Sequence, residues 1–98
     1  MEIKSAKSGD SLTISLFGML DTTTAPELQK FLDENLKEEK KLVLDLKELE
    51  YISSAGLRLI LATQKLMSKK GELVITNVND TVNEIFTMTG FSKMLTIK

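Results

Sequence analysis

The sequence contains no cysteine and no histidine. Without thiols and imidazoles, disulfides, the usual zinc sites, thiol nucleophiles and imidazole acid–base catalysis are excluded. No apolar run approaches the roughly 20 residues of a membrane span, and the N-terminus lacks the charged start and long apolar core of a signal peptide. We therefore expect a soluble cytoplasmic protein with no cofactor, no metal site and no membrane partner.

An excess of positive charge is also missing. The chain has 13 basic and 14 acidic residues, a net charge of −1, and no dense basic stripe with interleaved aromatic residues. Such a stripe is the usual footprint of nucleic-acid binding, so direct binding of nucleic acid is not expected. The length of 98 residues suits one hydrophobic core, and residues 1–98 are predicted to form a single domain.

The most informative stretch is residues 51–57, Tyr-Ile-Ser-Ser-Ala-Gly-Leu. An apolar run precedes it at 42–44, and apolar residues at helical spacing follow it, so a strand should end and a helix begin here. Ser53 or Ser54 is predicted to be the N-cap. Unpaired N–H groups and the helix dipole favour a phosphate at this point, and Gly56 allows a backbone or a phosphate to approach closely. The pattern indicates a phosphorylatable serine at a helix start.

The N-terminal half predicts a hairpin followed by a helix. Residues 1–6 and 12–16 are expected to be strands joined by the turn Ser8-Gly9-Asp10, and residues 18–21 should end the second strand. Thr24 to Glu27 matches a capping box, with Thr24 as N-cap, Glu27 reaching back to it and Pro26 in the first turn. The apolar face of the helix that follows comprises Leu28, Phe31, Leu32 and Leu36.

The C-terminal half alternates strands and helices. After a charged loop at 37–41, strand 42–46 is almost continuously apolar, which predicts burial on both faces. The central helix should run to about Lys70 with Gly71 as its C-terminal cap. Strand 73–75, a short helix capped by Thr81, Asn79 or Asp80 and ended by Gly90, and a strand at 94–97 follow. The five methionines are expected to fill the core.

These elements predict an α/β fold. The sheet should be mixed, mostly parallel, with about five strands and an antiparallel N-terminal edge hairpin, accompanied by three to four helices. Projected on the central helix, Arg58, Ala62, Lys65 and Lys69 fall in one line. That line is either the solvated side of the helix or a surface that meets an acidic partner.

Three segments together resemble the STAS domain of bacterial anti-sigma factor antagonists. Residues 45–57 resemble the signature segment of that family, residues 18–21 its Gly-x-Leu-Asp turn, and residues 85–91 its C-terminal helix ending in glycine. The three segments span nearly the whole chain in the family's order. The family pattern commonly reads Asp-Ser-Ser/Thr-Gly; aligned on Gly56, Ser53 stands in place of the aspartate and Ala55 in place of the second hydroxyl.

The resemblance implies a role in partner switching. In this family the unphosphorylated antagonist binds an anti-sigma factor, often a serine kinase, and so frees a sigma factor for transcription. The kinase phosphorylates a serine that aligns with Ser54, and a serine phosphatase reverses the modification. The residues expected to form the partner-binding site are Asp21, Thr22, Ser53, Ser54, Ala55, Gly56, Arg58, Ala62 and Lys65.

Three alternatives stay open at this stage. The two serines could be simple N-caps, and Asp21 an ordinary turn residue. The chain could instead be a STAS regulatory or scaffold subunit of a transporter, a lipid-transport complex or a stress-signalling complex. A small α/β enzyme or nucleotide binder is a third reading, but no Gly-x-Gly-x-x-Gly, no Gly-x4-Gly-Lys-Ser/Thr and no nucleophile paired with a base is present. We therefore do not expect an enzyme.

Overall fold

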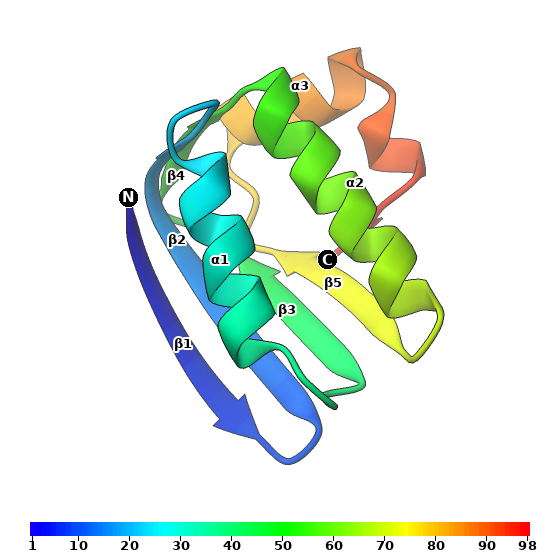
Figure 1. Cartoon of the computed structure of the whole chain (residues 1–98). Coiled ribbons are helices and arrows are strands. Elements are labelled where there is room, and N and C mark those ends of the chain that lie inside the picture. The colour runs from blue at the N-terminus through cyan, green and yellow to red at the C-terminus, as the bar shows by residue number, and fades with distance from the viewer.

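The computed structural model describes all residues from 1 to 98 as one mixed sheet with helices packed mainly on one of its faces (Figure 1). The strands are β1 (Glu2–Ser8), β2 (Ser11–Leu20), β3 (Lys41–Asp45), β4 (Leu49–Ile52), β5 (Glu72–Thr76) and β6 (Thr96–Ile97). The helices are α1 (Ala25–Asn35), α2 (Ser54–Ser68), α3 (Asp80–Met88) and the short 3₁₀ helix η1 (Phe91–Lys93). The predicted α/β fold class is confirmed.

The strand order is β1-β2-β3-β5-β6, and β4 pairs separately with β2. β1 and β2 form the predicted antiparallel hairpin, whose turn contains Gly9 at a φ of 60°. All other pairings are parallel. The carboxyl ends of β2 and β4 therefore point the same way, toward the loops that precede α1 and α2 (Figure 1).

The prediction that residues 18–21 end the second strand was wrong. β2 continues through Gly18 to Leu20, because Gly18 adopts a φ of 100° and the register shifts at a bulge between Gly18 and Met19. β2 pairs with β3 as far as Ser15, and from Gly18 onward it pairs with β4. β4 was not predicted, because it has only four residues and two of them, Glu50 and Tyr51, are exposed.

The core lies between the sheet and the helices α1 and α2. Leu12, Ile14 and Leu16 of β2 are fully buried, and on the helices Leu28, Leu32, Leu57 and Ile60 close over them. Strand 42–46 was predicted to be buried on both faces, but Leu42 and Leu44 are buried whereas Val43 between them is only half-buried. The helices α1 and α2 cover the same face of the sheet (Figure 1), which explains the alternation.

The predicted helix ends are partly confirmed. Asn79 is the N-cap of α3 and accepts a hydrogen bond from the Val82 N–H at 2.9 Å, so Thr81 does not cap it. Gly90 ends α3 at a φ of 80°. Gly71 has no left-handed conformation; a Cβ there would lie 1.6 Å from the Lys40 carbonyl oxygen, so close backbone approach explains this glycine. The last strand is shorter than predicted, because η1 precedes it.

The methionines do not all fill the core, contrary to the prediction. Met67 is fully buried, but Met19, Met88 and Met94 are exposed. Their spacing gave no indication of this, since single apolar residues on a surface are common. None of the helices has both the length and the apolar character that crossing a membrane requires.

Candidate functional site

The start of α2 separates the roles of the two serines. Ser53 is the N-cap: its backbone is extended, and its hydroxyl oxygen accepts a hydrogen bond from the Gly56 N–H at 3.5 Å. Its carbonyl also accepts from the Leu57 N–H at 2.9 Å. Ser54 is the first residue of the helix, is exposed and makes no side-chain hydrogen bond. The hydroxyl of Ser54 is therefore free, while that of Ser53 is used in capping.

Gly56 fixes the position of this helix start. It is buried, and a Cβ on it would lie 2.8 Å from the side chains of Ile52 and Leu20 and 2.9 Å from the Leu20 carbonyl oxygen. The groups that approach Gly56 closely are thus two side chains and one carbonyl of the protein itself. Because Gly56 is buried, it offers no surface to a partner, and its contribution to the predicted site is to hold α2 against the end of β2.

The loop between β2 and α1 lies beside this helix start and is organised by Asp21. The Asp21 carboxylate accepts hydrogen bonds from the Thr23 and Thr24 N–H groups at 2.9 and 3.0 Å and from the Thr24 hydroxyl at 3.2 Å. The Thr24 N–H bond first, and then the other two, lower the pKa of Asp21 below its ordinary value, since each stabilises the carboxylate. Asp21 therefore organises the turn through its own carboxylate, and its predicted place beside the partner site stays a prediction.

The same bonds overturn the predicted capping box at Thr24. Thr24 is the N-cap by position, but its hydroxyl caps no α1 N–H. It donates to the Met19 carbonyl at 2.7 Å and accepts from the Asp21 N–H at 2.8 Å. Its hydrogen bonds therefore close the loop on itself, and Glu27 has no capping role. Pro26 lies in the first turn of α1, as predicted.

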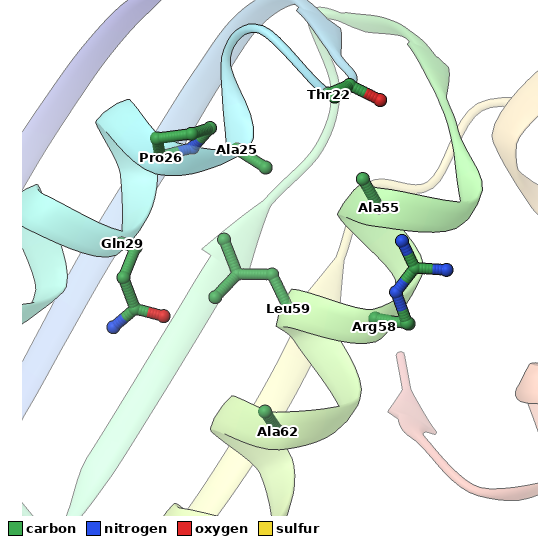
Figure 2. A pocket seen from close by; sticks show the side chains of 8 residues that line it. All are labelled: Thr22, Ala25, Pro26, Gln29, Ala55, Arg58, Leu59 and Ala62. Atoms are coloured by element: carbon green, nitrogen blue, oxygen red, sulfur yellow. The ribbon is translucent and has the colours of Figure 1, made fainter.

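A groove of about 360 Å³ lies between the N-terminal halves of α1 and α2 (Figure 2). Leu59 of α2 points across it toward α1 (Figure 2). The residues that line it are Thr22, Ala25, Pro26, Gln29, Ala55, Arg58, Leu59 and Ala62. Small side chains and the separation of the two helices leave this space open.

Four predicted site residues line the groove: Thr22, Ala55, Arg58 and Ala62. Ser54 lies next to Ala55 on the exposed side of the helix start, and Lys65 is exposed about one turn beyond Ala62. The side of the groove formed by α1 was not predicted; its residues are Ala25, Pro26 and Gln29. The sequence around these residues gives no sign of this role, because their place in the groove depends on α1 lying beside α2.

The predicted exposed line on α2 is confirmed, since Arg58, Ala62, Lys65 and Lys69 are all exposed. None of these three cations forms an ion pair. No cluster of three or more carboxylates that could hold a metal ion is present. The site presents a free hydroxyl, a shallow apolar groove and unpaired positive charge, and these features suit the binding of a partner.

Sequence comparison finds similar proteins over nearly the whole chain. The family model of the STAS domain matches residues 2–98. BtrV of Bordetella bronchiseptica is 38% identical over 93 residues, which cover 93% of this chain and 80% of that protein. The anti-sigma F factor antagonist of Paenibacillus polymyxa is 34% identical over 89 residues, 88% of this chain and 76% of that protein.

Two solved structures have the same fold. An anti-sigma factor antagonist from Mycobacterium paratuberculosis superposes with a TM-score of 0.87 at 22% identity, covering 98% of this chain and 83% of that one. The phosphorylated form of SpoIIAA, a cell fate determinant of Bacillus, superposes with a TM-score of 0.72 at 17% identity, covering 99% of this chain and 91% of that one.

Proposed function

The chain belongs to the STAS domain family, and we propose that it is an anti-sigma factor antagonist whose unphosphorylated form binds an anti-sigma factor and so releases a sigma factor. The relative from Paenibacillus polymyxa, which carries this function in its name, supports the proposal. The observation that carries it is the exposed, unengaged hydroxyl of Ser54 at the first residue of α2, beside an open groove.

Phosphorylation of Ser54 is the proposed off switch. A serine kinase, the anti-sigma factor itself, transfers the γ-phosphoryl group of a nucleoside triphosphate to the Ser54 oxygen, and the hydroxyl proton and a nucleoside diphosphate leave. A serine phosphatase restores the hydroxyl by hydrolysis and releases inorganic phosphate. The occurrence of SpoIIAA of Bacillus in a phosphorylated form supports the assignment of such a modification to this family member.

The added charge acts on binding more than on folding. A phosphate brings about −1.5 to −2 charges, and the exposed helix start can accommodate it because the dipole there is positive. At an interface the same charge would have to lose its water. A penalty of about 3 to 4 kcal/mol for that desolvation would weaken binding by roughly two to three orders of magnitude.

The proposed partner surface consists of the groove and the residues around Ser54. Thr22, Ala55, Arg58 and Ala62 would contact the partner through the groove, and Lys65 would extend the contact along α2. Asp21, Ser53 and Gly56 would hold this surface in shape, since their polar groups or buried positions are occupied within the protein.

A capture experiment from the native cell extract tests this proposal. Ser54→Ala and Ser54→Asp proteins serve as baits, and the bound proteins are identified by mass spectrometry. Ser8→Asp is the matched control, because it places the same charge at the hairpin turn at the other end of the molecule (Figure 1). We expect an anti-sigma factor kinase to bind Ser54→Ala and Ser8→Asp but not Ser54→Asp.

The same experiment distinguishes an anti-sigma factor antagonist from a STAS scaffold subunit. Capture of transporter, lipid-transport or stress-signalling subunits by all three baits, with no kinase, would show that the domain is a scaffold subunit and that Ser54 is not its switch.

A further inference from the structure

Basic side chains are absent from almost all of the chain around Ser54. Residues 16–29, which form the end of β2, its loop and the start of α1, contain no lysine or arginine. Residues 71–92, which include β5 and α3, also contain none. Between residues 48 and 64 there is a single one, Arg58. Arg58 is therefore the only basic side chain on these three segments.

Arg58 is close enough to Ser54 to contact a phosphate on it. It follows Ser54 by four residues in the same helix, and side chains four apart share a helix face with their Cβ atoms roughly 5 to 6 Å apart. Long side chains in a helix also lean toward its N-terminus. Figure 2 shows the Arg58 guanidinium turned back beside Ala55, toward the first turn of α2.

Arg58 is also free to make this contact. It is exposed, it takes part in none of the three ion pairs of the molecule, and its guanidinium donates no hydrogen bond within the protein. The order of the pair, anion first and cation four residues later, is the favourable one on a helix. The planar guanidinium can donate two parallel hydrogen bonds to phosphate oxygens, which an ammonium group cannot.

We infer that Arg58 is the intramolecular ligand of the phosphate on Ser54, so that phosphorylation changes the pairing of this arginine as well as adding charge. Without the phosphate, Arg58 lines the groove as an unpaired cation and is available to an acidic group of the partner. With the phosphate, Arg58 pairs with the modified Ser54 of the same helix and is no longer available to the partner. The local charge of the pair changes from +1 to roughly −0.5 to −1, so the groove edge changes sign.

This inference rests on the proposed modification of Ser54, but its test involves neither the anti-sigma factor nor the kinase. The full chain is prepared with phosphoserine incorporated at position 54, and the second pKa of the phosphate, ordinarily about 6, is measured by ³¹P NMR titration. The same titration is done on the Arg58→Gln, Arg58→Lys and Lys65→Gln proteins. The Asp21 carboxylate of the adjoining loop and the Met1 ammonium, which acts on it, are present in all four proteins, so a difference between two proteins reports the substituted side chain.

We expect Arg58→Gln to raise the phosphate pKa by about 0.2 to 0.4, since the dianion loses its neighbouring cation. Arg58→Lys should lie between the parent and Arg58→Gln, because the charge remains but the two parallel hydrogen bonds are lost. Lys65→Gln, which removes an equally exposed cation two turns further along α2, should leave the pKa unchanged. Arg58 is exposed, so its removal leaves the core intact.

A second measurement reports the contact itself. The Nε–H signal of Arg58 in a ¹H–¹⁵N spectrum should move downfield when Ser54 carries phosphate. An identical phosphate pKa in the parent and Arg58→Gln proteins would overturn the inference. An Arg58 Nε–H chemical shift that is the same with and without the phosphate would also overturn it. Either result would leave the proposed antagonist function standing, and a partner indifferent to Ser54 would remove that function without affecting these two readings.

Discussion

The Ser53 N–H donates a hydrogen bond of 2.9 Å to the Leu20 carbonyl oxygen, and this bond joins the last residue before α2 to the last residue of β2. It places the loop that begins at Asp21 directly beside the helix start that displays Ser54. Gly56 packs against the same Leu20. The two sides of the proposed partner surface are thus positioned by one strand end.

The first prediction concerns Gly56. Replacing a helical glycine by alanine ordinarily stabilises a helix, by about 0.5 to 1 kcal/mol. Here the new Cβ would lie 2.8 Å from Ile52 and Leu20, so we expect Gly56→Ala to lower the free energy of unfolding by about 1 to 3 kcal/mol. Urea denaturation measures it. A more stable Gly56→Ala protein would show that α2 is not held this closely against β2.

The second prediction concerns the acid stability that Asp21 provides. Its folded-state pKa is lowered, so the stabilisation is fully present above the ordinary value of 3.8 and is lost as the pH falls through the lower folded-state value. We expect Asp21→Ala to reduce the melting temperature at pH 7 and to have a smaller effect in strong acid. Asp21→Asn keeps an acceptor oxygen for the Thr23 and Thr24 N–H groups and should lose less than Asp21→Ala at neutral pH. Equal losses in both variants at every pH would contradict this role of the carboxylate.

Glu39 should make a separate contribution to acid stability at the opposite end of the molecule. Its carboxylate accepts from the Lys37 N–H at 2.7 Å and lies 3.0 Å from the Lys7 ammonium. These interactions, the Lys37 bond first, lower its pKa from 4.5 to about 2. The stabilisation is therefore present above pH 4.5 and disappears as the pH falls through about 2.

Urea unfolding of Glu39→Gln between pH 2 and 6 tests this assignment. The variant should be less stable than the parent at pH 6, and the difference should shrink toward pH 2. Glu38→Gln is the control, because Glu38 is exposed and forms no ion pair. A constant difference across the whole pH range would show that the loss does not come from ionisation of Glu39.

The exposed cations of α2 lead to a kinetic prediction. If Arg58 and Lys65 face an acidic surface of the partner, reversing either charge should slow association several-fold at low salt and have less effect at high salt. Stopped-flow association with the captured anti-sigma factor measures this, with the exposed Lys93 of η1, replaced in Lys93→Glu, as a control outside α2. Unchanged association rates at low salt would remove electrostatic steering from the account.

The sequence predicted those parts of the fold that depend on local chemistry. The hairpin turn at Gly9, the serine cap of α2, the asparagine cap of α3 and the glycine that ends it all follow from backbone and side-chain preferences within a few residues. The confirmed exposure of Arg58, Ala62, Lys65 and Lys69 likewise follows from helical periodicity alone.

The features that the sequence did not reveal depend on contacts between distant segments. The bulge at Gly18 and strand β4 exist because each pairs with the other. At Thr24 a capping pattern was present, but Asp21 and Met19 took its hydrogen bonds. The groove needs α1 beside α2, so Pro26 and Gln29 could not be assigned to it from their neighbours in the chain. Gly71 is needed because the Lys40 backbone, more than 30 residues away in the chain, approaches it too closely for a Cβ.

The central claim is that a phosphate dianion on Ser54 weakens the binding of the partner to this surface. The most direct test is the dissociation constant of the captured anti-sigma factor for the unphosphorylated protein and for the protein with phosphoserine at position 54, measured by titration calorimetry. The account predicts binding roughly 100- to 1,000-fold weaker for the phosphorylated protein with an almost unchanged melting temperature. Equal dissociation constants for the two forms would contradict it.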